Sequence, residues 1–349
     1  MIVVNARFLT QEITGVQRYG MEISRALKKQ NPDIQFICSH DIIHSDLADE
    51  LDVIKIGRMH GHLWEQIELP LFLKKNKQPL LINLANTAPV FYKNKISTIH
   101  DIAFEKFPQN FSWQFRQLYK FLIPKIILSS RKIFTVSDFS KSEICAFYST
   151  PHASIDVIKN ATSSIFSHNP ITKDQKKYVL AVSSLTQQKN FSRLIDAFNM
   201  LNDQKHELLL VGSINRNFAS QSLIDKIDSN PRIKFAGRVS DSELVRLYSN
   251  AKAFIHPSLY EGFGIPPLEA QACGCPVICS NIASLPEVCG DSALYFDPYD
   301  SSDISEKIDS VLADPNLSQK LTQSGYENVK RFSWESSANK ILASIKDLQ

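Results

Sequence analysis

The chain has 349 residues, of which 43% are hydrophobic and 21% are charged, and its net charge at neutral pH is +3. This length and composition are typical of a soluble protein with two domains, each able to bury a core. Residues 1–165 carry 20 Lys and Arg against 15 Asp and Glu, whereas residues 166–349 carry 19 against 21. The basic excess of the first half is small, and no basic patch is rich in aromatic residues, so nucleic acid is not an expected partner. The excess suits a first half that contacts something anionic.

In chain order, the first half alternates short apolar segments with helical patterns. The expected strands are residues 2–5, 34–38, 53–56, 80–83, 96–100, 132–137 and 155–158. The expected helices are residues 15–30, 63–75, 112–130 and 138–148. In the first helix, Val16, Tyr19, Ile23 and Leu27 follow the spacing of one helical face, which predicts that this face packs on a sheet.

The second half repeats the alternation more regularly. Its expected strands are residues 178–182, 207–211, 232–236, 253–256, 276–279 and 293–296. Its expected helices are residues 190–201, 218–229, 241–250, 266–273, 301–313 and 316–331. Continuous apolar strands separated by helices indicate parallel sheets covered on both faces. The predicted fold class is therefore α/β, with two doubly wound Rossmann-like domains whose strand ends face a central cleft.

The domain boundary is expected in the polar, proline-containing segment SSIFSHNPITKDQKK. We therefore predict an N-terminal domain at 1–165, a linker at 166–177 and a C-terminal domain at 178–332. The segment 333–349 is a helical pattern that follows the second sheet, and packing back on the N-terminal domain is one position open to it.

Signals for export and for membrane insertion are missing from the sequence. No segment reaches the ~18 apolar residues of a membrane span, and the opening MIVVNARFL lacks the basic region of a signal peptide. Four of the six cysteines, Cys273, Cys275, Cys279 and Cys289, lie close together but form no C-x₂-C pair. These features predict a cytoplasmic protein with buried, reduced thiols rather than a zinc site.

The segment richest in chemical information is HPSLYEGFGIPPLE at 256–269, directly after an expected strand. Its glycines, Gly262 and Gly264, allow the backbone to approach a ligand closely, and the two prolines that follow suit the first positions of a helix. The start of that helix offers unpaired N–H groups to an anion. Glu261 and Glu269 can then bind two hydroxyl-bearing parts of one ligand. The alternative is a solvated loop with an acidic residue near a helix start.

Over nearly its whole length the sequence resembles the retaining glycosyltransferases of family 4, also called glycosyl transferases group 1, which have the GT-B fold. Their hallmark pair of Glu separated by seven residues corresponds to Glu261 and Glu269. Further similar segments are ITGVQRY at 13–19, HD at 100–101, VSDFSKSEI at 136–144, Asn160-Ala161, LTQQKN at 185–190 and ACGCPVICSNIASLPEV at 272–288. The opening NARFLTQEITGVQRY is most similar to bacterial enzymes that assemble O-antigen and other surface polysaccharides.

The resemblance implies a role for each matching residue. Glu261 would bind hydroxyls of the donor sugar, Glu269 would bind the ribose, and Lys189 would neutralise the departing phosphate. His100 would lie at the donor sugar, with Asp101 orienting it or capping the next turn. The other residues implied around the donor are Gly15, Ser184, Gly262, Phe263, Gly264 and Ile265. Arg18 and Tyr19 are the residues expected at the acceptor.

One departure from the family pattern concerns the phosphate cations. The family commonly has an Arg five residues before this Lys, and some relatives have an Arg directly before it. Here these positions are Ser184 and Gln188. Arg193, Arg238 or Arg18 could replace the missing cation, or the helix dipole could suffice.

The expected reaction moves a hexose of the mannose, rhamnose, glucose or galactose type from a nucleotide-diphosphate sugar to an acceptor hydroxyl, with retention as the resemblance implies. The chain contains no Asp-x-Asp motif, so we expect no metal and no other cofactor, with charge on the leaving group stabilised by Lys189 and a helix N-terminus. An epimerase of nucleotide sugars and a non-catalytic nucleotide-sugar-binding protein are the alternatives on the same two-domain plan.

The acceptor expected from the resemblance is a glycan, free or linked to a polyprenyl diphosphate. The segment WQFRQLYKFLIPKIILSSRK at 113–132 mixes aromatic, aliphatic and basic residues. It is either an interfacial helix, which would give a peripheral contact with anionic lipid at the cytoplasmic face of the inner membrane, or a core-packed helix with a basic face in water.

Overall fold

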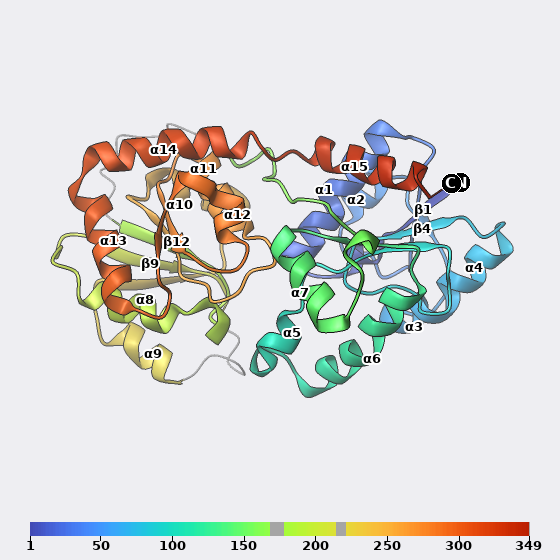
Figure 1. Ribbon diagram of the computed structural model, residues 1–349, viewed down its shortest axis with the longest axis horizontal. Coiled ribbons are helices and arrows are strands. Elements are labelled where there is room, and N and C mark those ends of the chain that lie inside the picture. Colours follow the sequence, from blue (N-terminus) through green and yellow to red (C-terminus); the bar gives the residue numbers. More distant parts are fainter. Residues whose placement is uncertain (168–177, 214–220, 349) are drawn as a thin grey trace. The chain divides into compact units, whose positions relative to one another are not determined.

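The computed structural model describes residues 1–167, 178–213 and 221–348, and it divides into two compact units (Figure 1). Unit 1 comprises Met1–Glu105, Ser112–Asn160 and Ser333–Gln349, and unit 2 comprises Lys106–Phe111 and Ala161–Phe332. Each unit contains one parallel sheet with helices packed on it, which confirms the predicted fold class of two Rossmann-like domains. Of the linker predicted at 166–177, only residues 166 and 167 lie within the described residues.

Unit 1 has a seven-stranded sheet in the order β3-β2-β1-β4-β5-β6-β7. Its strands are β1 (Ile2–Asn5), β2 (Gln35–Cys38), β3 (Ile54–Lys55), β4 (Leu80–Asn83), β5 (Lys95–Thr98), β6 (Lys132–Thr135) and β7 (Ile155–Val157). The strand order reverses between β1 and β4, where Asn5 is in register with Asn83. Because loops diverge at such a reversal, the carboxyl ends of β1 and β4 border a crevice that can hold a ligand.

The helical segments of unit 1 cover both faces of this sheet (Figure 1). They are η1 (Arg7–Thr10), α1 (Gly15–Gln30), α2 (Ser45–Glu50), α3 (Gly61–Leu63), η2 (Trp64–Glu68), α4 (Leu69–Lys75), α5 (Ala103–Lys106), α6 (Trp113–Ser129), α7 (Asp138–Tyr148), η4 (His152–Ser154) and α15 (Trp334–Lys346). The C-terminal helix α15 packs along α1, where the Gln30 side chain donates to the Glu335 carbonyl at 2.9 Å. The C-terminal segment thus belongs to unit 1.

Unit 2 has a six-stranded sheet in the order β10-β9-β8-β11-β12-β13. Its strands are β8 (Tyr178–Val182), β9 (Glu207–Val211), β10 (Ile233–Gly237), β11 (Phe254–His256), β12 (Val277–Ser280) and β13 (Ala293–Phe296). Its helical segments are η3 (Pro108–Asn110), η5 (Gln187–Lys189), α8 (Phe191–Asn199), α9 (Gln221–Asp228), α10 (Asp241–Asn250), α11 (Ile265–Ala272), α12 (Leu285–Cys289), η6 (Gly290–Ser292), α13 (Ser301–Ala313) and α14 (Pro315–Val329). Here the strand order reverses between β8 and β11.

Side-chain caps explain why several helices begin where they do. Ser112, Ser137, Ser240 and Ser333 each accept a hydrogen bond from a backbone N–H of the first turn, and so do Asp300 and Asp314. Such a bond satisfies one of the N–H groups that a helix start leaves unpaired. The caps are local in sequence, and the predicted starts of these helices lie close to the observed ones.

Two predictions about the first half are wrong in detail. The single helix predicted at 63–75 is divided into α3, the π-helical turn η2 and α4, because Leu69 donates to the Trp64 carbonyl five residues back and Pro70 has no N–H to donate. The N-terminal domain predicted at 1–165 ends at Asn160, and it lacks the segment 106–111, which belongs to unit 2, where Phe107 packs 6.0 Å from the ring of Tyr260.

Candidate active site

The candidate site of unit 2 lies where its strand order reverses. Strands β8 and β11 are neighbours in the parallel sheet, so the loops that follow them leave the same edge. The loop after β8 carries Ser184 and Lys189, and the loop after β11 carries Glu261 and leads into α11. The topology therefore brings together two motifs that lie about 70 residues apart in the sequence.

A three-residue polar cluster joins these loops. Lys189 Nζ donates to Glu261 Oε1 at 2.7 Å, and His256 Nε2 lies 2.8 Å from the same oxygen. A carboxylate only accepts hydrogen bonds, so the His256 nitrogen that faces it carries the hydrogen. The side chain of Glu261 is only 12% exposed and that of His256 only 2%. Two of these residues were predicted, and His256 was not.

The charge of Glu261 is fixed by this cluster. Burial alone would raise the pKa of the Glu261 carboxyl, but the ammonium of Lys189 and the hydrogen bond from His256 outweigh burial and hold the pKa well below its usual range. Glu261 is therefore ionised at neutral pH. An ionised carboxylate at a partly open loop can accept hydrogen bonds from sugar hydroxyls, and the ammonium beside it can bind phosphate.

Gln188 and Asn190, on either side of Lys189, hold the loops in this arrangement. Gln188 Nε2 donates to the Tyr260 carbonyl at 2.6 Å, and the Leu259 N–H donates to the Gln188 carbonyl at 2.8 Å. Asn190, which has a positive φ of 59°, donates to the carbonyls of Pro257 and Pro298. At the position where some relatives carry Arg, this chain thus has a side chain that ties two loops together.

The loop between Glu261 and α11 is shaped by glycine and by a buried hydroxyl. Gly264 precedes the helix with a φ of 97°, in the left-handed region where a side chain is strained. Ser284 Oγ donates to the carbonyls of Glu261 and Phe263 at 3.0 and 2.8 Å. These contacts fix the path of the loop that leads to the start of α11, where Gly262 and Ile265 are both buried. The positive dipole end of this helix favours an anion.

Glu269 lies one turn further along α11 and is buried, with 6% of its surface exposed. Tyr248 Oη donates to Glu269 Oε2 at 3.4 Å. Burial of Tyr248 and the charge of Glu269 raise the pKa of this phenol, so the tyrosine stays protonated and able to donate. Glu269, the residue predicted to bind the ribose, is thus a buried carboxylate that is held in position by Tyr248 of the neighbouring helix α10.

Ser184 contributes its backbone rather than a phosphate cation. The Thr186 N–H donates to the Ser184 carbonyl at 2.9 Å, and the preceding Ser183 lies against Gly212 at the end of β9. A Cβ on Gly212 would lie 1.8 Å from the Ser183 carbonyl oxygen, so only glycine fits. Gly212 thus sets the path of the loop after β8.

Arg193 is the one alternative cation that the structure places beside the Lys189 loop. It lines a cavity of about 560 Å³ together with Thr186, Gln187 and Asn190, and its Nη1 donates to Asn190 Oδ1 at 3.1 Å. Arg238 lies after β10, at the edge of the same sheet, and Arg18 lies in α1 of unit 1. Of these three cations, Arg193 is the one in α8, directly after the Lys189 loop.

His100 and Asp101 belong to unit 1, directly after β5. His100 is 5% exposed, and burial lowers its pKa to about 4, so the imidazole is neutral. Its Nε2 lies 3.0 Å from the Leu84 carbonyl, which requires the hydrogen on Nε2 and leaves Nδ1 as an acceptor. Asp101 Oδ1 accepts from the Ala103 N–H at 2.9 Å, and so Asp101 caps the turn that follows.

The residues predicted on α1, Gly15 at the donor and Arg18 and Tyr19 at the acceptor, have different surroundings. Gly15 is exposed at the first position of α1, and Arg18 is partly buried one turn later. Tyr19 is fully buried, with its ring edge-on to His100 at 4.8 Å and to Trp334 at 6.0 Å. The prediction that Tyr19 contacts the acceptor is therefore wrong for this structure, because the apolar face of α1 turns that ring into the core, where it supports His100.

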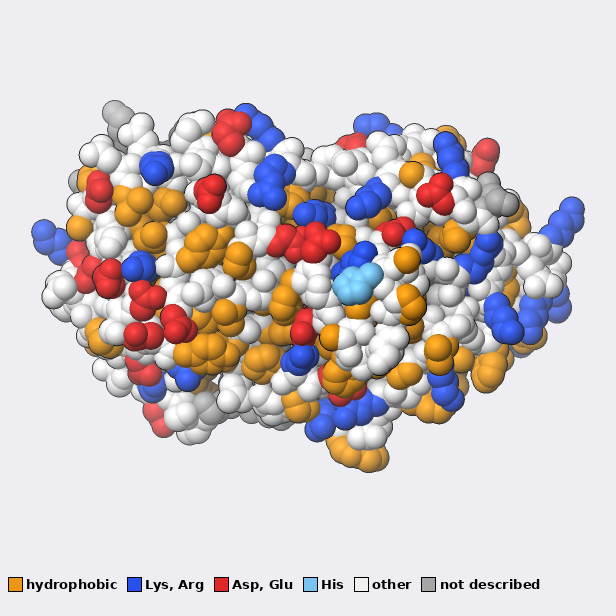
Figure 2. Space-filling view, viewed as in Figure 1, with side chains coloured by type: hydrophobic (Ala, Val, Ile, Leu, Met, Phe, Trp, Pro, Cys, Tyr) orange, Lys and Arg blue, Asp and Glu red, His pale blue; other side chains and the backbone are white. Residues whose placement is uncertain are grey.

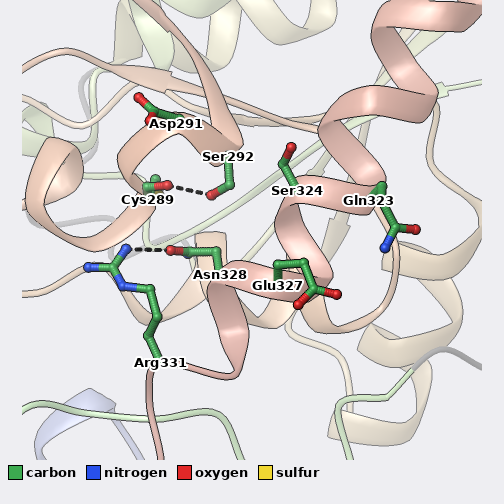
Figure 3. Close-up of a pocket in the computed structure, with 8 residues that line it drawn as sticks. All are labelled: Cys289, Asp291, Ser292, Gln323, Ser324, Glu327, Asn328 and Arg331. Carbon is green, nitrogen blue, oxygen red and sulfur yellow. Dashed lines mark hydrogen bonds between the residues drawn. The ribbon is translucent and has the colours of Figure 1, made fainter.

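A second cavity of unit 2, of about 350 Å³, lies between the η6 region and α14 (Figure 3). Arg331 Nη1 donates to Asn328 Oδ1 at 2.6 Å on one side of it, and Asp291 and Glu327 give it an acidic character. None of the predicted site residues lines this cavity. All six cysteines are buried free thiols.

Clusters of metal ligands and membrane-spanning helices are both absent from the described residues. Within residues 1–167, 178–213 and 221–348, no three His, Cys, Asp or Glu side chains are grouped as metal ligands. Over the same ranges, the helices are too short or too polar to cross a bilayer.

The chain is similar to known glycosyltransferases. Residues 164–328 match the family model for glycosyl transferases group 1. The chain is 29% identical to the O-antigen chain mannosyltransferase B of Escherichia coli, covering 96% of both chains. It is 27% identical to the O-antigen chain mannosyltransferase RfbU of Salmonella typhimurium, covering 89% of this chain and 90% of that protein.

Solved structures share the fold at lower identity. The structure of HepE from Anabaena in complex with UDP and glucose superposes with a TM-score of 0.77 at 16% identity, covering 99% of both chains. The match of residues 164–328 includes Lys189, Glu261 and Glu269, the residues on which the geometry of unit 2 depends. The chain therefore contains a glycosyl transferases group 1 domain, and the protein is a glycosyltransferase.

Proposed function

We propose that the protein transfers mannose, with retention of configuration and without a metal, from a nucleotide-diphosphate sugar to a glycan acceptor in the assembly of a bacterial surface polysaccharide. The observation that carries the proposal is the Lys189–Glu261–His256 cluster at the start of α11. The choice of mannose and of an O-antigen type of glycan rests on the names of the two full-length relatives. HepE, which shares the fold, was solved with UDP and glucose, which supports a nucleotide-sugar donor.

In the proposed reaction, the bond between the anomeric carbon and the diphosphate oxygen breaks, and a bond to the acceptor oxygen forms. Negative charge develops on the leaving diphosphate, and the ammonium of Lys189 and the start of α11 stabilise it. The acceptor hydroxyl loses its proton, which the departing diphosphate can take. Glu261 holds the donor sugar through its hydroxyls, and Glu269 holds the ribose.

Lys189 and Glu261 form an ion pair at the proposed donor site. An ammonium has three hydrogens, so a bound diphosphate can share Lys189 with the carboxylate or compete with it for the ammonium. Once Lys189 turns to phosphate, Glu261 keeps the hydrogen bond from His256 and gains free acceptor capacity for the sugar. Donor binding thus prepares the carboxylate that holds the sugar.

Nucleotide release tests the activity. Purified protein is incubated with GDP-, UDP- and dTDP-linked hexoses, with and without a mannoside acceptor, and the released nucleoside diphosphate is measured. We expect release from a mannose donor, stimulated by the acceptor, and a product with an α linkage if the donor is α-linked. Inversion at the anomeric carbon would reject retention, and interconversion of donor sugars without a glycan product would favour an epimerase.

We also propose that unit 1 docks on anionic lipid, where a polyprenyl-linked acceptor would lie. Large hydrophobic side chains are exposed on α6 at Trp113, Phe121 and Leu128, and on the α3 to α4 segment at Leu63 and Leu71. Lys120 and Lys125 are exposed between the apolar residues of α6, and Lys125 Nζ lies 3.5 Å from the centre of the Phe121 ring. Figure 2 includes exposed hydrophobic and basic side chains along the α4 and α6 side of unit 1.

Vesicle flotation tests the docking. We expect binding to phosphatidylglycerol vesicles at low salt and loss at high salt, since each basic residue near the surface contributes about 1 kcal/mol that salt screens. Lys120→Glu with Lys125→Glu should weaken binding strongly. The charge-matched control, Lys205→Glu with Lys234→Glu in unit 2, should leave it unchanged. Equal failure to bind anionic and neutral vesicles would reject membrane docking.

A further inference from the structure

Unit 1 contains a second buried ion pair at the reversal of its strand order. Arg7 follows β1 and Glu65 lies in the π-helical turn η2, and Arg7 Nε donates to Glu65 Oε1 at 3.1 Å. Asn5 and Asn83 end the two strands at the reversal, and Asn5 Nδ2 donates to both Glu65 Oε1 and Asn83 Oδ1. Arg7 Nη2 donates to Thr87 Oγ1 at 2.6 Å, in the loop after β4. The side chains of Arg7 and Glu65 are only 6% and 1% exposed.

One half of this cluster is left unsatisfied. Glu65 Oε2 and His62 Nδ1 are both buried, and neither has a hydrogen-bond partner. They lie 3.6 Å apart, which is longer than a hydrogen bond between them allows. An unpaired oxygen of a buried carboxylate costs free energy, so its presence requires an explanation. A π-helical turn is rare and is found mostly at functional sites, and here it carries Glu65.

We propose that His62 and Glu65 bind a hydroxyl of the acceptor sugar, an inference that rests on the proposed function. An oxygen about 2.8 Å from each atom fits between two atoms that are 3.6 Å apart. The hydroxyl donates its hydrogen to Glu65 Oε2 and accepts one from His62 Nδ1. A sugar hydroxyl, unlike a phosphate, supplies the donor that an ionised carboxylate needs.

The charge state of the site agrees with this ligand. Burial alone would raise the pKa of Glu65, but the positive charge of Arg7 outweighs burial and lowers the pKa to about 2. Glu65 is therefore an acceptor at neutral pH. Arg7 is committed to Glu65 and Thr87, so the cluster offers a neutral sugar no excess positive charge. This argues against a phosphate as the ligand.

His62 connects the cluster to the protein surface. Its side chain is 36% exposed, whereas that of Glu65 is 1% exposed, so the imidazole lies between the buried carboxylate and solvent. A sugar hydroxyl would therefore reach the pair from the side of His62.

Acceptor kinetics test the inference. Donor hydrolysis without acceptor, and transfer to methyl α-mannoside over a range of concentrations, are measured for the full chain and for His62→Ala, His62→Asn and Glu65→Gln. We expect His62→Ala to raise the acceptor KM about tenfold or more, as loss of a hydrogen bond in a charged network does. Asparagine places an amide nitrogen near the Nδ1 position, so His62→Asn should recover part of that loss.

The controls separate a binding role from a structural one. His60→Ala removes a neighbouring histidine that is paired with Asp41 instead, and it should leave the acceptor KM unchanged. Nucleotide affinity and the unfolding temperature should be unchanged in His62→Ala. An unaltered acceptor KM in His62→Ala, or equal effects on donor and acceptor, would overturn the proposal. If the wild-type chain uses no donor, the proposed function fails, and NMR titration with methyl α-mannoside of wild type against His62→Ala decides the site by itself.

Discussion

The two sheets carry a buried cation–carboxylate pair at the same topological position, yet the pairs are built differently. In unit 2, Lys189 and Glu261 retain 19% and 12% exposure, and a flexible ammonium makes the contact. In unit 1, Arg7 and Glu65 are almost completely buried and are further bonded to Asn5 and Thr87. A lysine pair of this kind can open to a charged ligand, whereas an arginine held by several fixed partners stays closed.

This difference separates a site that can bind a charged ligand from a site that can bind a neutral one. The lysine pair can release its cation to a diphosphate, which suits the side of the reaction where charge develops. The arginine pair holds its charge internally and leaves one carboxylate oxygen for a hydroxyl donor. Parallel sheets place functional loops at the reversal of strand order in both units, but the residues in those loops decide which ligand can enter.

The largest expected effect is on stability in unit 1. Arg7→Ala leaves the Glu65 carboxylate buried without its cation and should lower the free energy of unfolding by about 3–5 kcal/mol. Lys189→Ala is the matched change in unit 2 and should cost much less, because Glu261 keeps His256 and some contact with water. Urea unfolding of both variants measures the difference. Equal losses would show that the two pairs are energetically alike.

Acid titration sharpens the same comparison. The pKa of Glu65 is lowered from 4.5 to about 2, so its ionisation stabilises the fold above pH 4.5, and this contribution is lost as the pH falls towards 2. The shift corresponds to about 3 kcal/mol. The difference in unfolding free energy between wild type and Glu65→Gln should therefore shrink between pH 6 and pH 3. A constant difference over that range would mean that the charge of Glu65 does not stabilise the fold.

In unit 2 the effect should appear in catalysis. Glu261→Ala should reduce turnover by about a hundredfold or more, since it removes contacts that hold the reacting sugar. Affinity for the free nucleoside diphosphate should not fall, because the variant frees Lys189 from its competing carboxylate. Calorimetry and initial rates measure the two quantities. Markedly weaker nucleotide binding would contradict the role assigned to Glu261.

A smaller effect is expected at Glu269. Its proposed ligand, the ribose, is present in both the donor and the nucleoside diphosphate product. Glu269→Gln should therefore weaken the binding of both by about 1–3 kcal/mol. Tyr248→Phe is a useful companion, because it removes the hydroxyl that bonds Glu269 and keeps the ring. Nucleotide affinity that is the same in Glu269→Gln and wild type would refute the ribose contact.

The smallest expected effect is that of a chelator. If Lys189 and the start of α11 stabilise the leaving diphosphate, activity should survive excess EDTA. Rates before and after treatment, and after addition of manganese or magnesium, provide the measurement. Loss of activity that either metal restores would replace the charge argument with a metal-dependent one.

Much of the fold follows from local pattern. Strands such as β1 and β4 are continuous apolar segments, α1 and α7 have one apolar face, and polar caps begin several helices, so their positions could be predicted. The donor motif was equally accessible, because Glu261, Gly264 and Glu269 lie within one loop and helix. His256 could have been found as well, since a histidine that directly ends a strand before that loop must lie close to it.

What the sequence determined by itself was the succession of strands and helices and the chemistry of each loop. Tertiary structure alone decided which loops meet: Arg7 with Glu65 and Thr87, and Lys189 with Glu261, are pairs separated by 58 to 80 residues. It also placed Gln188, whose side chain bonds the Tyr260 carbonyl, between the loops after β8 and β11. The physical reason is that hydrogen bonding between parallel strands sets their order, and this order is encoded in contacts between distant segments rather than in any local periodicity.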